Sequence, residues 1–131
     1  MRGVFIKRAN VISEDSRRKI ISILNGEIIV RDIHLLEMKK GETENGFIKM
    51  PLGNHKHFYP EVCYVYKGKC KYWLKNKEGE TMECDLNEGD IMFRAPEVTH
   101  TCQCTEDCIL IDGASESWIS EDWNHVKEVL K

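Results

Sequence analysis

The sequence predicts an all-β domain, and three observations support this. The chain has 131 residues and a mass of 15.3 kDa, which is enough for one domain but not for two. Apolar residues make up 41% of it, enough to form a core. Short runs rich in β-branched residues recur about every 8–12 residues with turn residues between them, a spacing typical of antiparallel sandwiches and barrels. We therefore treat residues 1–131 as a single domain.

The expected strands follow from alternation and turn signals. Residues 26–38 are rich in β-branched side chains, and residues 39–42 read as a turn. Asn76-Lys77-Glu78-Gly79 predicts a hairpin turn between two alternating runs. The remaining expected strands are 61–66, 69–75, 80–86, 90–94, 99–103 and 108–112.

The C-terminal segment has a different periodicity. Ser120 is a suitable N-cap, and Trp123, Val126 and Leu130 fall on one face of a helix. We expect a short amphipathic helix over residues 120–131, packed on the outside of the domain.

Charge and composition exclude some classes of partner. Lys plus Arg is 19 and Asp plus Glu is 22, a net charge of −3, which argues against nucleic acid as the main partner. No apolar run approaches the roughly 20 residues that span a bilayer, and no secretory signal is evident, so no membrane association and a cytoplasmic location are expected. In that compartment the six cysteines are expected to be reduced core residues rather than a disulfide framework.

Two distant segments carry the residues best suited to chemistry. His55 and His57 are two positions apart, so on a strand they share one face with Cα atoms about 6.6 Å apart, and both imidazoles can reach one ion. Glu61 has the same parity, and His100 follows a later strand and a proline turn. Three imidazoles and a carboxylate suit one divalent transition metal, namely Zn, Fe, Ni, Mn or Co. The alternative is that these histidines are solvated loop residues.

These segments resemble the two signature motifs of the cupin superfamily. The likeness covers residues 53–104 and is carried by His55, His57, Glu61 and Gly68 in the first motif and Gly89, Pro96 and His100 in the second. Glu97 stands where the family usually has a glycine after the proline. The resemblance implies a double-stranded β-helix, or jelly-roll barrel, here with a short C-terminal helix. It also implies frequent homodimerisation.

A weaker resemblance concerns the substrate. Residues 15–20 and 53–55 look like segments of cupins that act on nucleotide-activated sugars, the epimerase and ketoisomerase group. This likeness implies a small-molecule ligand such as a sugar phosphate or nucleotide sugar. Many enzymes of that group work without a metal and use a histidine base.

Five further residues are candidates for the site, each with a structural alternative. Tyr59 shares the parity of the ligands and is either a proton donor or a packing aromatic. Cys63 and Cys102 share faces with Glu61 and His100, and they either line the pocket or fill the core. His34 and Arg94 are candidate substrate-binding residues. Arg94 is expected at the barrel mouth, where its guanidinium either binds a phosphate or carboxylate group of the ligand or is exposed to solvent. For His34, the alternative to substrate binding is a core or cross-strand packing role.

The function expected from these residues is a metal-dependent isomerase or epimerase acting on a sugar derivative. The metal would polarise a hydroxy-carbonyl group as a Lewis acid while a base, such as Glu61, removes the neighbouring proton. An Fe(II) dioxygenase and a non-catalytic binding module are the alternatives, since the barrel hosts many functions.

Overall fold

The computed structural model describes residues 1–40, 52–55 and 59–116, the four residues 52–55 by their backbone only. The regular secondary structure of these residues consists of strands joined by turns and loops, and no helix is present among them. The strands are β1 Val4–Arg8, β2 Asn10–Glu14, β3 Lys19–Ser22, β4 Asp32–Met38, β5 Leu52–His55, β6 Glu61–Lys67, β7 Lys69–Lys75, β8 Thr81–Asn87, β9 Asp90–Arg94, β10 Thr99–Cys104 and β11 Cys108–Ala114.

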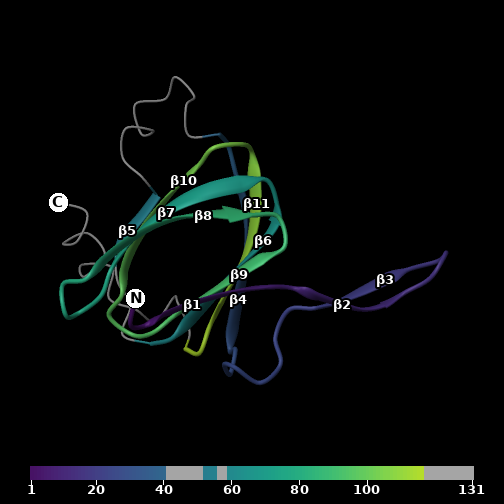
Figure 1. Cartoon of the computed structure of the whole chain (residues 1–131), viewed down its shortest axis with the longest axis horizontal. Coiled ribbons are helices and arrows are strands. Elements are labelled where there is room, and N and C mark those ends of the chain that lie inside the picture. Colours follow the sequence, from purple (N-terminus) through teal and green to yellow (C-terminus); the bar gives the residue numbers. More distant parts are fainter. Residues whose placement is uncertain (41–51, 56–58, 117–131) are drawn as a thin grey trace.

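Two antiparallel sheets face each other and form a barrel (Figure 1). One sheet has five strands in the order β1-β9-β6-β11-β4, and the other has four in the order β5-β10-β7-β8. Sequential strands therefore pass repeatedly from one sheet to the other. This is the expected jelly-roll arrangement, and the all-β prediction is confirmed.

The expected strands from Glu61 onward all form, with ends within two residues of the prediction. The prediction for residues 26–38 is wrong in its first part, because β4 begins only at Asp32. The chain before it crosses the outer face of the five-stranded sheet, where Val30 packs against Val62. Gly113 permits this crossing, since a Cβ atom there would lie 3.0 Å from Val62 and 3.2 Å from Val30. Strands β1 to β3 were not expected from the sequence.

The core fills the space between the sheets. Along β7 and β10 its buried side chains alternate with more exposed ones, as strand geometry requires. Along β6 and β9 most residues are buried, because the chain before β4 covers their outer face. The core residues include Cys63, Val65, Cys70, Tyr72, Leu74, Leu86, Met92, Val98, Cys102, Cys104, Cys108 and Leu110.

Two motif glycines have conformations that other residues rarely adopt. Gly68, between β6 and β7, has φ of 85°, and a Cβ there would lie 2.2 Å from the carbonyl oxygen of Asp107. Gly89, between β8 and β9, has φ of 92°. The glycines of the two motifs are therefore required by the tight turns that close one end of the barrel.

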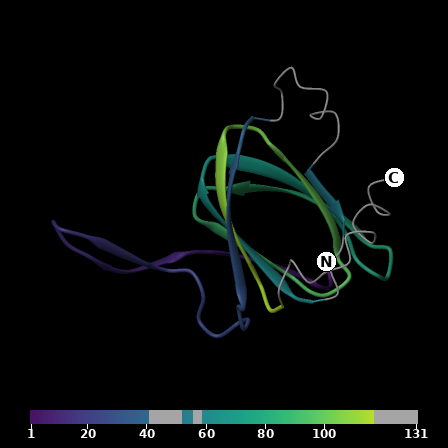
Figure 2. The ribbon, with the colours of Figure 1, turned by 180° about the vertical axis from the view of Figure 1, so that it is seen from behind.

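Strands β2 and β3 form a hairpin that projects away from the barrel, as both views show (Figures 1 and 2). They pair with each other and with no other strand of the described chain. Asp15 orders the tip, since its Oδ1 accepts hydrogen bonds from the backbone N–H groups of Arg17 at 2.8 Å and Arg18 at 3.1 Å. We call residues 10–22 the arm.

The expected helix at 120–131 lies outside the described residues and stays a prediction. Among the residues that the structure describes, no helix has the length and apolar character needed to cross a membrane.

Candidate active site

Charged side chains are buried at one end of the barrel interior. Glu61 begins β6 and Arg94 ends β9, and the antiparallel register places them opposite each other. The Nη2 atom of Arg94 lies 3.6 Å from Oε1 of Glu61, and the two side chains are 2% and 10% exposed. Burying charges is costly unless they are paired, so this ion pair is a built feature of the interior. We call this region, with Asp112 and His100, the polar end.

Arg94 lies deeper than the sequence predicted. We expected it around the barrel mouth, yet β9 places its side chain inside, with its guanidinium carbon 5.8 Å from the centre of the Tyr72 ring. Burial has the largest single effect on the pKa of Arg94 and lowers it, but the acidic groups around the guanidinium, Glu61 first among them, together outweigh burial and raise that pKa. Within the described part of the chain, its Nε and Nη1 atoms are buried without a hydrogen-bond partner. These N–H groups are available to a ligand.

Tyr72 connects the two sheets across the interior. Its hydroxyl lies 3.4 Å from the Sγ atom of Cys63 on β6, and Cys102 is its register partner on β10. Burial raises the pKa of the Cys63 thiol and raises that of Cys102 to about 12. Both thiols are therefore protonated at neutral pH, and they suit weak hydrogen bonding and packing better than nucleophilic chemistry.

Asp112 adds a second carboxyl group to the polar end. Its Oδ1 atom is buried without a hydrogen-bond partner among the described residues. Burial raises its pKa, although the positive charge of Arg94 opposes the shift. His34 is its register partner on β4, with Nε2 3.3 Å from Oδ1 of Asp32. His34 thus borders the polar end, and its role in substrate binding stays a prediction.

The predicted histidines are only partly described. His100 is buried, with 7% of its surface exposed, on the same face of β10 as Cys102. The backbone register places His55 opposite His100. His57 lies outside the described residues. Tyr59 is also buried, two residues before β6 begins.

The described residues give a partial test of the expected metal. No group of three His, Cys, Asp or Glu side chains among them is arranged to hold an ion. The side chains of His55 and His57 lie outside the described part of the chain, so the complete ligand set stays a prediction. The Arg94 guanidinium beside Glu61 is a positive charge that would repel a cation bound to the same carboxylate. Glu61 therefore fits the role of counter-ion to Arg94 better than that of a metal ligand.

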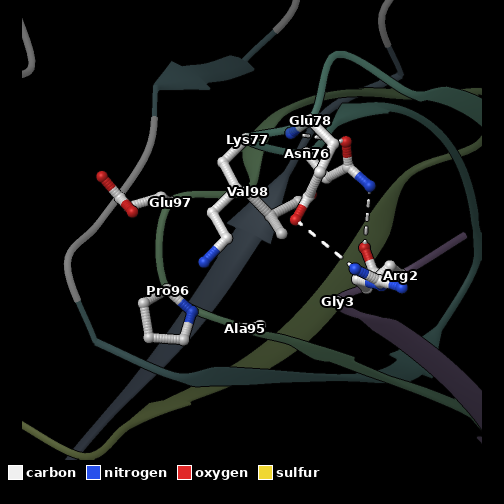
Figure 3. A pocket seen from close by; sticks show the side chains of 9 residues that line it. All are labelled: Arg2, Gly3, Asn76, Lys77, Glu78, Ala95, Pro96, Glu97 and Val98. Carbon is white, nitrogen blue, oxygen red and sulfur yellow. Dashed lines mark hydrogen bonds and ion pairs between the residues drawn. The ribbon is translucent and has the colours of Figure 1, made fainter.

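A separate surface pocket of about 320 Å³ lies beside the N-terminus (Figure 3). Its polar groups bind one another: Asn76 Nδ2 donates to the carbonyl oxygen of Arg2 at 3.2 Å, and Arg2 lies 4.0 Å from Glu78. None of the predicted site residues lines it. The barrel interior is therefore the stronger candidate.

Two residues of the polar end were missed by the sequence reasoning. Tyr72 has the same strand parity as Cys70 and Leu74, which assigns it to the inner face, but nothing in the sequence shows that it spans to the opposite sheet. The sequence analysis placed Asp112 on a strand and gave it no role in the site. An acidic residue within an otherwise apolar strand is nevertheless a sign of a functional side chain.

The chain matches several solved structures in fold. A TDP-quinovose 3,4-ketoisomerase from Campylobacter jejuni aligns with a TM-score of 0.75 and 16% identity over 99% of this chain and 98% of that one. A dTDP-4-dehydrorhamnose 3,5-epimerase from Sulfolobus tokodaii has a TM-score of 0.73 and 17% identity over 95% and 76% of the chains. A sugar 3,4-ketoisomerase from Thermoanaerobacterium thermosaccharolyticum, in complex with TDP, has a TM-score of 0.70 and 19% identity over 98% and 96%.

The sequence itself matches no protein-family model and no curated protein. The structural likeness covers nearly all of the chain and establishes its fold as the cupin jelly roll of these sugar-nucleotide isomerases and epimerases.

Proposed function

We propose that the chain is an isomerase or epimerase of a nucleotide-activated keto sugar. The observation that carries this is the match to TDP-sugar ketoisomerases over nearly the full length of both chains, and to an epimerase over 95% of this chain and 76% of that one. The polar end also supports it, because the buried Nε and Nη1 donors of Arg94 have no hydrogen-bond partner among the described residues and can bind a polar substrate.

The two reactions share their first step. A base removes the proton from the carbon next to the sugar ketone, and the electron pair of that C–H bond moves to the ketone oxygen. In a ketoisomerase the resulting enediolate is protonated on the former carbonyl carbon, while the neighbouring hydroxyl becomes the new ketone. In an epimerase the proton returns to the original carbon from the opposite face. Both reactions require a base, an acid and stabilisation of a negative oxygen.

Arg94 is the described residue best suited to stabilise that oxygen. Its Nε and Nη1 groups are available, and its charge is held in place by Glu61 at 3.6 Å. Fixed donors in a dry site stabilise developing charge without reorganising, which makes such stabilisation a large contribution to catalysis. A keto oxygen that becomes anionic would gain a charge-assisted hydrogen bond from Arg94.

We assign proton transfer to the histidines of the first motif. A carboxylate paired with a guanidinium is a weaker base than a free one, which argues against Glu61 in that role. His55 or His57 would then remove the proton near neutral pH, with buried His100 and Tyr59 as candidate donors. Cys63, Cys102 and His34 would border the sugar.

The first test follows proton exchange directly. The protein is incubated with TDP-4-keto-6-deoxyglucose in D₂O, and ¹H NMR monitors loss of the signal next to the ketone and appearance of a new keto sugar. We expect exchange with wild-type protein, a loss of about 100-fold or more in His57→Asn, and wild-type rates in Thr81→Ala, an exposed control on β8. Absence of exchange with this and related keto sugars would overturn the proposal.

A second test addresses the metal. We expect activity to survive dialysis against a chelator, with equal and negligible metal by elemental analysis in wild type and in His57→Ala. Activity that is lost on chelation and restored by one divalent ion would instead support the metal-dependent mechanism with His55, His57, Glu61 and His100 as ligands.

A further inference from the structure

Three buried thiols meet at the end of the barrel opposite the polar end. Cys70 is the second residue of β7, Cys104 is the last residue of β10, and Cys108 is the first residue of β11. Each is 2% exposed or less, and all six cysteines of the chain have free thiols. The proposed reaction uses none of these three side chains, so their proximity needs a separate explanation.

Cys104 and Cys108 face each other across residues 105–107, which connect the two sheets. Their thiols are in hydrogen-bond contact. The carbonyl oxygen of Lys69 accepts hydrogen bonds from Sγ of Cys108 at 2.9 Å and from the backbone N–H of Thr105 at 3.0 Å. This shared acceptor holds the two ends of the connection together. Two thiols that already touch can form a disulfide with little movement of the backbone.

Cys70 is the competing thiol. It is the register partner of Cys104 on β7, so its side chain lies on the same inner face of the sheet. Burial raises the pKa of the Cys70 thiol, which keeps it protonated and unreactive at neutral pH. Cys108 is therefore the better partner for Cys104.

A small molecule can reach Cys108 from the surface. Its side chain lines a surface pocket of about 370 Å³, together with Lys39 and Lys67. Burial raises the pKa of the Cys108 thiol, and the contact with the Cys104 thiol opposes that rise. A buried thiol of this kind reacts with a small, strong oxidant in preference to a large one.

We propose that Cys104 and Cys108 are a redox-active pair, which hydrogen peroxide or a similarly small peroxide converts into a reversible disulfide. The Cys108 sulfur, after losing its proton, attacks one peroxide oxygen. The O–O bond breaks, a sulfenic acid forms, and the leaving hydroxide takes up the proton as water. The Cys104 sulfur then attacks the Cys108 sulfur and releases its hydroxyl, with the Cys104 proton, as a second water. Two thiols are oxidised, and one peroxide is reduced to two waters.

The disulfide would join the two sheets covalently. β10 belongs to the four-stranded sheet and β11 to the five-stranded sheet. In the reduced protein the Cys108 thiol donates to the carbonyl oxygens of Lys69 and, at 3.1 Å, Glu106. Oxidation replaces these hydrogen bonds with a covalent link, and a thiol reductant reverses the change.

The first test maps the link in the folded wild-type protein. The protein is treated with hydrogen peroxide, its remaining thiols are alkylated, and it is cleaved after glutamate for mass spectrometry. Cleavage places Cys104 and Cys108 on separate peptides, residues 98–106 and 107–116. We expect these two peptides as one linked species that separates on reduction. Absence of that species, or a link to the peptide that carries Cys70, would overturn the proposal.

The second test uses variants, because residues 98–106 also contain Cys102. In Cys104→Ser we expect no linked species, and a Cys108 sulfenic acid that dimedone traps. Cys84→Ser, which removes a half-buried thiol on β8, is the matched control and should form the link as wild type does. A link that persists in Cys104→Ser would contradict the assignment.

Should Cys104→Ser fail to fold, fragmentation of the linked wild-type peptides decides. The fragment masses distinguish a bond at Cys104 from one at Cys102, and a bond at Cys102 would overturn the proposal. These measurements need no keto sugar, so the redox pair and the proposed function fail separately.

Discussion

The two ends of the barrel interior differ in chemistry although β6, β10 and β11 contribute to both. At the polar end lie Glu61, Arg94, His100 and Asp112, with buried donors available to a ligand. The other end, which we call the apolar end, buries Val65, Cys70, Leu86, Cys104 and Leu110. A small domain tolerates costly buried charges where function needs them and relies on close apolar packing elsewhere.

The turns at the two ends of the barrel also differ, in the residues that adopt left-handed backbone conformations. Gly68 and Gly89 occupy the left-handed conformations at the apolar end, as the local geometry requires. At the polar end Glu97 takes a left-handed φ of 65° in the turn where the family usually has glycine. Strained backbone held by a non-glycine residue is common near functional sites.

The largest expected effect is at the polar end. Arg94→Met should lower the free energy of unfolding by about 3–5 kcal/mol, because it leaves the Glu61 charge buried and unpaired. Urea denaturation measures the loss. The double variant Glu61→Gln with Arg94→Met should recover most of it while remaining inactive. If Arg94→Met alone lowered the free energy of unfolding by less than about 1 kcal/mol, the ion pair would not be a structural feature of the interior.

At the apolar end, Leu86→Ala should lower the free energy of unfolding by about 3 kcal/mol, because Leu86 is fully buried and its truncation leaves a cavity. Keto-sugar turnover below the melting transition should stay near the wild-type rate. Stability and turnover measured on the same preparations check this contrast. A turnover that falls as steeply as in Arg94→Met would contradict the separation of the two ends.

Asp112→Asn should stabilise the protein at neutral pH. Burial raises the pKa of Asp112 in the folded state, so the folded protein holds this proton more tightly than the unfolded chain. Its contribution to stability is therefore present at low pH and is lost as pH rises from the ordinary aspartate pKa through the raised one. In melting curves from about pH 4 to about pH 8, the melting temperature of the variant relative to that of wild type should increase as pH rises. A variant less stable than wild type at neutral pH would indicate that Arg94 needs the Asp112 charge.

The smallest expected effect concerns the turn of the polar end. Glu97→Gly should raise stability by about 1 kcal/mol, because glycine adopts a positive φ without the steric cost borne by other residues. Thermal unfolding measures this gain in stability. Lys77→Gly, in the neighbouring hairpin turn, is the control variant and should be no more stable than wild type. Equal gains in both variants would argue against strain at Glu97.

Much of the fold was predictable because strand alternation and turn residues are local signals. The strand Asp90–Arg94 and the turn at Asn76-Lys77-Glu78-Gly79 are confirmed, with Asn76 accepting backbone hydrogen bonds from Glu78 and Glu80. Strand β1 could not be predicted from local signals because it is held by pairing with the distant strand β9. Strands β2 and β3 form a local hairpin, so distance does not explain why the sequence analysis did not predict them.

The sequence by itself determined the all-β class, the turn glycines and the grouping of Glu61 with the inner-face residues of its strand, since each depends on period or on backbone conformation. The jelly-roll arrangement was implied only by the resemblance of the two motifs to a known family. Only the tertiary structure decided that Arg94 lies inside the barrel against Glu61, that Tyr72 spans to Cys63, and that Asp112 joins them. Those contacts come from strands far apart in the chain. Which charges share a dry interior depends on how two sheets are paired and stacked, and alternation within one strand does not encode that arrangement.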